Sequence, residues 1–248
     1  MRVAALYDIH GNLPALDAVL DDVRQAEVDQ IVVGGDVFPG PIPRETVARL
    51  LDLDVPARFI LGNGDREVLS RMRGAENGAL PEPVREVIRW VAESLRPEDE
   101  RLIGGWPSTI HIDVDGLGRV LFCHATPRND TEVFTRRTSE ELLSPIFGSL
   151  DAQLVVCGHT HMPFDRRIGE VRVVNAGSVG MSFAGPGAFW LLLGSGVELR
   201  RTDYDLAMAA ERIRSTSYPQ AQDFPANNVL QPPSQATTLD LLARVELK

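Results

Sequence analysis

The segment VAALYDIHGN (residues 3–12) decides the fold that the sequence predicts. Its first half, VAALY, is a short apolar run typical of a buried strand. Its second half, DIHGN, is polar and contains Asp8 and His10, two side chains that can bind a metal ion. Residues 13–27 then place leucine and valine at helical spacing, and Pro14 suits the first turn of a helix. The segment therefore predicts a strand, a functional loop and a helix, in that order.

The same unit recurs further along the chain. The apolar run 30–35 ends at Asp36, and the run 57–62 ends at Asn63. Such alternation of strands and helices indicates a parallel sheet, in which functional side chains gather at the carboxyl ends of the strands. Amphipathic helices are predicted over 44–53 and 83–96.

The second half of the sequence changes character and favours hairpins. Turn dipeptides such as Asp115–Gly116 separate pairs of apolar segments. Hairpins are predicted over 108–124, 166–177 and 188–204, a buried strand over 152–159, and helices over 138–147 and 205–216. We therefore predict an α/β fold with two mixed β-sheets packed as a sandwich and helices outside. The whole chain, 1–248, is expected to form one domain, with 219–248 an irregular tail plus a short helix over 238–247.

Composition narrows the class of protein. Of the 248 residues, 44% are hydrophobic and 24% are charged, an ordinary balance for a globular domain. The formal net charge of −10, without a Lys/Arg cluster, makes nucleic acid a poor candidate partner. No apolar run is long enough to span a bilayer, and the first residues lack the pattern of a signal peptide. We therefore expect a soluble cytoplasmic protein, and the sequence leaves open a homo-oligomer.

Metal-capable side chains stand at the ends of five predicted strands. Loops at such strand ends converge in open α/β sheets. Four of the five histidines of the chain fall there, and the fifth, His111, lies within a predicted strand and is expected to be structural. The predicted ligand set is Asp8, His10, Asp36, Asn63, His124, His159 and His161.

The chemistry of this set predicts two metal ions. Oxygen donors from two aspartates and one asparagine combine with four imidazoles, a mixture that suits manganese, iron or zinc better than calcium or magnesium. Seven ligands exceed what one tetrahedral zinc ion takes. Two ions that share one carboxylate account for the number.

The order of the motifs resembles that of the calcineurin-like metallophosphoesterase superfamily. These motifs are DIH (8–10), GD (35–36), GN (62–63), CH (123–124) and GHTH (158–161). The stretches GPIPRE, GNGDRE, HATPR and NAGSVG make the chain most similar to the small bacterial and archaeal phosphodiesterase branch. The resemblance covers about residues 1–180 and implies a four-layer α/β/β/α fold, in agreement with the two sheets predicted above.

The resemblance also implies a role for each ligand. Asp8, His10 and His161 correspond to the ligands of the first metal, whereas Asn63, His124 and His159 correspond to those of the second. Asp36 corresponds to the bridging carboxylate and is a candidate catalytic residue. The implied reaction is in-line attack of a metal-bridging hydroxide on the phosphorus atom. We expect two divalent ions, manganese first and iron, zinc or nickel as alternatives, with a small phosphate ester as substrate.

One position departs from the family pattern. Many members have a histidine directly after the metal-binding asparagine, assigned to binding phosphate and protonating the leaving group. Here that position is Gly64, and general acid catalysis typically contributes about 10²–10⁴-fold. Either the leaving group departs unassisted, or another residue or the substrate supplies the proton, or the enzyme is slow. Asp65 is a candidate catalytic residue that orders this loop; alternatively it caps a helix that begins with Arg66-Glu67.

Further residues near the ligands are candidates for substrate contact. Arg128, in HATPR, is a candidate for both catalysis and substrate binding because a guanidinium can hold phosphate through two N–H groups; a solvated loop arginine is the alternative. Asn63 and Asn12 are candidates for substrate binding, although turn chemistry accounts equally well for Asn12. Asn175 and Ser178, in NAGSVG, are expected to support the metal-binding loops.

The function that the sequence predicts is a metal-dependent phosphoesterase, with phosphodiesters favoured over monoesters. A phosphomonoesterase is one alternative. Another is a non-catalytic or weakly active binding protein on the same fold, although the sequence has lost no ligand. A nuclease is disfavoured by the acidic charge.

Overall fold

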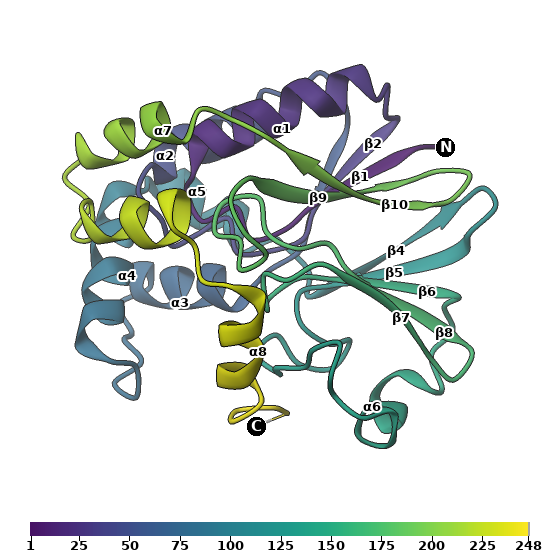
Figure 1. Cartoon of the computed structure of the whole chain (residues 1–248). Coiled ribbons are helices and arrows are strands. Elements are labelled where there is room, and N and C mark those ends of the chain that lie inside the picture. Colours follow the sequence, from purple (N-terminus) through teal and green to yellow (C-terminus); the bar gives the residue numbers. More distant parts are fainter. Residues whose placement is uncertain (248) are drawn as a thin grey trace.

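Two five-stranded sheets form the centre of the molecule (Figure 1). The structure, a computed structural model, describes residues 1–247. The first sheet has the strand order β10 (Val197–Thr202), β9 (Ala188–Leu193), β1 (Val3–Leu6), β2 (Gln30–Val33) and β3 (Ala57–Phe59). The second has the order β4 (Thr109–Val114), β5 (Gly118–Cys123), β6 (Leu154–Cys157), β8 (Val171–Asn175) and β7 (Phe164–Ile168). Both sheets are mixed, which confirms the predicted fold class.

Helices cover the outer faces of the two sheets. Those that share one buried apolar cluster with the first sheet are α1 (Leu13–Gln25), α2 (Pro43–Leu51), α3 (Asn63–Met72), α4 (Glu82–Ser94), α5 (Pro97–Ile103) and α7 (Leu206–Arg214). On the outer face of the second sheet lies α6 (Glu140–Phe147). The molecule thus has four layers, helix, sheet, sheet and helix.

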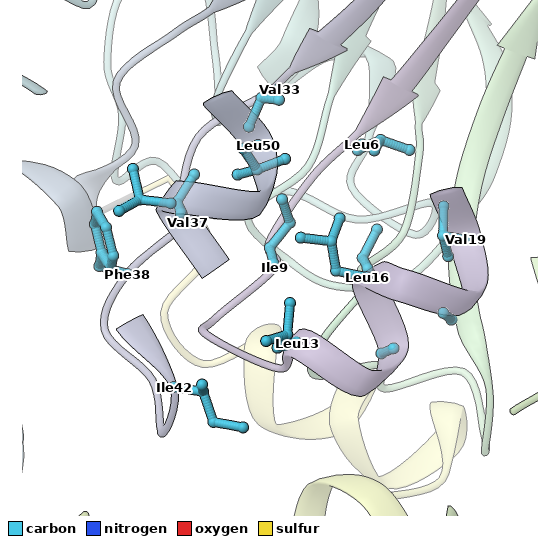
Figure 2. Close-up of a cluster of buried hydrophobic side chains, with 14 of the residues drawn as sticks. Leu6, Ile9, Leu13, Leu16, Val19, Val33, Val37, Phe38, Ile42 and Leu50 are labelled. Atoms are coloured by element: carbon cyan, nitrogen blue, oxygen red, sulfur yellow. The ribbon is translucent and has the colours of Figure 1, made fainter. Parts of the chain in front are cut away.

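Strand β1 shows how the sequence builds these layers. Val3, Ala5 and Tyr7 point into the core between the two sheets, whereas Ala4 and Leu6 point toward the helices. The alternation is the two-residue period of a strand buried on both faces. Figure 2 shows the helix side of this core, where side chains of α1 and α2 meet those of the first two strands.

The C-terminal tail is more ordered than its composition suggests. A π-helix, η1 (Pro225–Leu230), lies where an irregular segment was predicted, and it packs Val229 into the core cluster beside α7. Burial of this apolar residue outweighs the Pro- and Asn-rich composition. The final helix, α8, spans Gln235–Leu242, three residues ahead of the predicted start. Helix α5 is a further element that the sequence patterns do not predict.

The topology brings loops from both sheets to one edge. Strands β1 and β2 run parallel in the first sheet, and β5, β6 and β8 run parallel in the second. The loops that follow β1, β2, β5 and β6 carry six of the seven predicted ligands, and Asn63 opens α3 after β3. Among the described residues, no helix is long and apolar enough to cross a membrane.

Candidate metal centre

The seven predicted ligands converge in one place, in two groups that flank Asp36. In the first group, His10 Nε2 lies 3.2 Å from His161 Nε2, and His161 Nε2 lies 3.4 Å from Asp8 Oδ1. Asp36 Oδ2 lies 3.8 Å from His10 Nε2 and 3.5 Å from His124 Nε2 of the second group. One carboxylate oxygen therefore faces both groups.

Asn63 and two histidines form the second group. Asn63 Oδ1 lies 3.0 Å from His124 Nε2, and the same amide atom lies 2.9 Å from His159 Nδ1. With the amide reversed, its NH₂ group would instead donate to both rings and to the Asp130 carbonyl oxygen, 3.1 Å away. We assign the oxygen to this position. The lone pairs of the amide oxygen and of the two imidazole nitrogens then converge on one point, and a bound cation requires such an arrangement.

In each of the four candidate histidines, the contact of the outer ring nitrogen determines which nitrogen faces the centre. In every case it lies within hydrogen-bond distance of a backbone carbonyl oxygen, which can only accept, so the neutral ring carries its proton there. The pairs are His10 Nδ1 with Pro39 O (3.1 Å), His124 Nδ1 with Gly34 O (3.0 Å), His159 Nε2 with Thr131 O (3.2 Å) and His161 Nδ1 with Met181 O (2.7 Å). Four lone pairs therefore point inward, as in histidines that hold metal ions.

The buried carboxylates of the cluster also need positive charge. Burial raises the pKa of Asp8 and Asp36, but His161 beside Asp8 and His124 beside Asp36 outweigh it and lower both pKa values. Asp8 Oδ1 is buried and has no hydrogen-bond partner in the described chain. An orphaned carboxylate oxygen that lies 3.4 Å from His161 Nε2 and 3.9 Å from His124 Nε2 fits a bound cation.

The histidines divide according to their charged neighbours. Burial lowers the pKa of His124, yet the carboxylates of Asp36 and Asp8 raise it to about 10, and Asp8 raises the pKa of His161 in the same way. Burial and neighbouring histidines lower the pKa of His10, and that of His159 to about 4. Positive charge is thus held between the carboxylates, by protons on two histidines or by metal ions that replace them.

The backbone at the ligands is strained. Of the seven non-glycine residues in 1–247 with positive φ, five are predicted ligands. A non-glycine residue in the left-handed region costs roughly 1–3 kcal/mol and persists where the surrounding structure enforces it, commonly at functional sites. The five are Asp8 (φ 53°), His10 (45°), Asp36 (52°), His159 (67°) and His161 (55°).

Asp65 lies beneath the centre rather than in it. Its carboxylate is fully buried and accepts hydrogen bonds from the backbone N–H groups of Asp36 (2.8 Å), Phe38 (2.9 Å) and Gly62 (3.1 Å). Helix α3 begins at Asn63, three residues before the predicted start, so Asp65 stands in its first turn. Burial and the nearby Asp36 raise the pKa of Asp65 to about 8, and the N–H donors oppose this shift. Through these hydrogen bonds, the two carboxylate oxygens of Asp65 connect the loop that carries Asp36 to the turn before Asn63.

Gly64 is enclosed by the loop that follows β2. A Cβ atom at this position would lie 2.4 Å from the carbonyl oxygen of Phe38 and 2.8 Å from Pro39 Cδ. The Gly64 N–H donates to Asp36 Oδ1 at 2.7 Å and so orients the shared carboxylate. The space that a side chain would need at this position is filled by backbone.

Two residues of NAGSVG hold the ligand loops as expected from the sequence. Asn175 Nδ2 donates to the carbonyl oxygen of Gly158 (2.6 Å) and to Thr160 Oγ1 (3.1 Å), between the two histidines of GHTH. Ser178 Oγ donates to the carbonyl oxygen of Asp8 (2.7 Å). Gly158 allows the close approach of this loop, because a Cβ there would lie 2.5 Å from Asp8 Oδ2.

The candidate substrate residues Asn12 and Arg128 are engaged within the protein. Asn12 is fully buried; its Oδ1 accepts from the backbone of α1, and its Nδ2 donates to the Gly180 carbonyl at 2.9 Å. Arg128 forms a two-pronged ion pair with Glu132, with Nη2 2.7 Å from Oε1 and Nε 3.1 Å from Oε2. Its side chain is 55% exposed and lines a cavity beside His124.

Three further contributors were not anticipated from the sequence. The backbone carbonyls of Thr131 and Met181 orient His159 and His161, and sequence patterns carry no signal for such a role. Phe183 stacks on the His161 ring, with centroids 4.8 Å apart and planes at 26°. It lies 22 residues after GHTH, between glycines, where the sequence indicates only a core or rim aromatic residue.

Fold and site together define a metallophosphoesterase-like protein, and comparison with known proteins agrees. The model of the calcineurin-like phosphoesterase superfamily domain matches residues 1–193, so the chain belongs to that superfamily. An uncharacterised protein of Methanocaldococcus jannaschii is 27% identical over 241 residues, which cover 88% of this chain and 94% of the relative.

Two solved structures share the fold. A metallophosphoesterase from Sphaerobacter thermophilus has a TM-score of 0.72 and 24% sequence identity, over 91% of this chain and 98% of that one. A hypothetical protein from Pyrococcus horikoshii has a TM-score of 0.78 and 18% identity, over 94% of this chain and 99% of that one. The resemblance predicted from the motifs is thus confirmed at the level of family and fold.

Proposed function

We propose that this protein is a phosphoester hydrolase that uses two divalent metal ions and favours phosphodiesters. The observation that carries the proposal is the set of four imidazoles whose far nitrogens face backbone carbonyl oxygens. Their inward lone pairs join one amide and two carboxylate side chains; both carboxylates, His10, His124 and His161 are buried, whereas Asn63 and His159 are half-buried. The mixed donors favour manganese, with iron, zinc or nickel as alternatives.

The residues divide between two positions. Asp8, His10 and His161 would hold the first ion, and Asn63, His124 and His159 the second. Asp36 would contribute to both, since its Oδ2 faces His10 on one side and His124 on the other. When bound, such a pair of ions lowers the pKa of water and stabilises charge on the attacking and leaving oxygens.

The chain's own groups hold this arrangement in place. The backbone N–H of Gly64 fixes Asp36 Oδ1, which leaves Oδ2 directed at the two histidines. Asp65 connects the Asp36 loop to the turn before Asn63. We propose that Asp36 binds metal directly and that Asp65 acts as a positioning residue, through Asp36, without touching the substrate.

The charges around the site support a diester substrate. Arg128 is paired with Glu132, and Arg66 is paired with Asp130 and Glu67, so neither guanidinium is free of a carboxylate. A monoester dianion brings more negative charge to this neighbourhood than a diester monoanion does. We propose that Arg128 contacts the substrate outside the reacting phosphate, and that Asn12 belongs to the loop framework.

The missing proton donor limits the range of good substrates. Gly64 carries no side chain, and both oxygens of Asp65 face backbone N–H groups. The leaving group therefore departs without a proton from this position, and esters of acidic alcohols should react fastest.

The proposal is tested by a screen of divalent metals against activated phosphodiesters and phosphomonoesters. Wild-type protein and Asp36→Asn are compared. We expect manganese-dependent hydrolysis, faster for bis(p-nitrophenyl) phosphate than for p-nitrophenyl phosphate, and its loss in Asp36→Asn. Purified protein that binds no divalent metal and cleaves none of these esters would refute the proposal.

A further inference from the structure

A cavity of about 360 Å³ opens directly beside the second metal position. Its volume falls in the range of roughly 300–1,000 Å³ that small-molecule sites occupy. His124 forms part of its wall, and the Asp130 carbonyl oxygen, from the same wall, lies 3.1 Å from the amide of Asn63. A group attached to a phosphate at the metal centre can therefore enter this cavity.

The guanidinium groups of the cavity wall are already paired with carboxylates. Arg66 holds Asp130 through two N–H groups, Nε to Oδ2 at 2.7 Å and Nη2 to Oδ1 at 3.2 Å, and its Nη1 lies 3.0 Å from Glu67 Oε1. Arg128 holds Glu132 in the same two-pronged way. Two guanidinium groups thus face three carboxylates, and a second phosphate group would have to displace one of them.

The rest of the wall can both donate and accept hydrogen bonds. Ser108, Thr109 and Asn129 line the cavity, and among residues 1–247 their two hydroxyls and the Asn129 Nδ2 have no hydrogen-bond partner. No phenylalanine, tyrosine or tryptophan lines it, so the cavity offers no platform for stacking a flat ring. Unpaired hydroxyl and amide groups suit a neutral partner that also carries hydroxyls.

We infer that this cavity binds an uncharged, hydroxylated alcohol moiety of the substrate, so that the preferred phosphodiester is an ester of a polyol. The inference rests on the proposed phosphodiesterase function and narrows it to one class of substrate. Ser108 and Thr109 are the specificity-determining residues. Both lie outside the ligand set, at the start of β4.

Binding of product analogues to the manganese-loaded protein tests the inference directly. Glycerol phosphate, ethyl phosphate and 1,2-ethanediol bisphosphate are titrated by calorimetry. Glycerol phosphate should bind about tenfold more tightly than ethyl phosphate, the effect expected for gaining one or two hydrogen bonds to neutral groups. The double variant Ser108→Ala/Thr109→Val should bring that ratio close to one, whereas Thr109→Ser, which keeps the hydroxyl, should retain it.

Kinetics supply the second measurement. The ratio of kcat/KM for glycerol p-nitrophenyl phosphate to that for ethyl p-nitrophenyl phosphate should fall in the double variant and persist in Thr109→Ser. Equal binding of glycerol phosphate and ethyl phosphate would overturn the inference. Tighter binding of the bisphosphate would also overturn it, in favour of a second phosphate position. Failure of the proposed function is separate, because it appears as no hydrolysis of bis(p-nitrophenyl) phosphate by wild-type protein, whatever the binding ratio.

Discussion

A Cβ atom on Gly64 would lie 2.4 Å from the carbonyl oxygen of Phe38. The contact is with backbone, so a side chain at position 64 can be accommodated only if the loop after β2 moves. That loop also carries Pro39, whose carbonyl oxygen orients His10. The position where many family members carry a histidine is therefore closed here by the geometry of the metal-binding loops themselves.

Introducing a side chain at this position should damage the protein rather than restore acid catalysis. Gly64→His is expected to lower the free energy of unfolding by about 1–3 kcal/mol, as for other overpacked sites, and to lower phosphodiesterase activity. Thermal unfolding and kcat/KM on an activated diester measure the two effects. Gly78→Ala is the matched control, because a Cβ at Gly78 meets nothing within 4 Å. A Gly64→His variant as stable as wild type and faster on alkyl esters would contradict this expectation.

Replacing Asp65 by asparagine should weaken metal binding without removing a ligand. The variant puts an NH₂ group where a carboxylate oxygen now accepts backbone N–H groups, so at least one buried donor loses its partner, at a cost of roughly 1–3 kcal/mol. Since the Asp36 loop loosens, manganese affinity should fall about 10–100-fold, the usual effect of disturbing groups that support ligands. Calorimetric titration with manganese measures it.

Asp99→Asn separates general destabilisation from an effect on the site. Asp99 Oδ2 accepts the backbone N–H of Arg96 at 2.8 Å, a comparable contact at the start of α5. This variant should lose stability but keep the manganese affinity of wild type. Equal loss of affinity in both variants would mean that Asp65 has no special role at the metal centre.

Single ligand variants should resolve the two metal positions. His161→Ala should abolish binding at the first position and His159→Ala at the second, so each should hold about one ion where wild type holds about two. His111→Ala is the control, because this histidine is exposed on β4. Elemental analysis after gel filtration gives the stoichiometry. Two ions in both ligand variants would contradict the assignment.

Metal should also stabilise the folded protein. A ligand that binds only the native state at about one hundred times its Kd adds about 2.7 kcal/mol to the free energy of unfolding. Chelator treatment should accordingly lower the Tm of wild type, and the shift should be smaller in His161→Ala and His159→Ala. A Tm that is indifferent to manganese in wild type would argue against a metal centre.

The convergence of the candidate ligands could be predicted from the sequence because each of them follows a short apolar run. The carboxyl ends of parallel strands meet at one edge, so DIH after β1 and GHTH after β6 come together without any sequence proximity. Turn dipeptides likewise fixed the hairpin of β4 and β5. These features depend on local periodicity, which a sequence carries directly.

Other features depend on contacts that no local pattern encodes. The space beside Gly64 is filled by a loop about 25 residues upstream. The carbonyl oxygen of Thr131 orients His159, and such a backbone group has no sequence signature. Arg128 in HATPR suggests a phosphate ligand, but in the folded chain its guanidinium pairs with Glu132, which occupies two of its N–H groups. Helix η1 forms because Val229 is buried beside α7, and this burial outweighs the low helix propensity of the neighbouring proline and asparagine residues.

The C-terminal helix α8 should control the second metal position through the loop that it covers. Arg137 Nη1 lies 2.8 Å from Asp240 Oδ1, and the Leu247 N–H donates to the Val133 carbonyl at 2.8 Å. Two residues before Val133, the Thr131 carbonyl orients His159.

Deleting residues 235–248 should therefore free the loop 131–138 and weaken binding of one manganese ion several-fold, while the other ion binds as in wild type. Hydrogen exchange should rise in this loop and stay unchanged in β1 and β2. Calorimetric titration resolves the two binding events. Arg167→Ala is a suitable control, because Arg167 lies on β7 and donates to the Glu170 carbonyl of its own hairpin. Equal weakening of both ions in the deletion would show that α8 stabilises the whole fold rather than His159, since only the proposed second position uses this histidine.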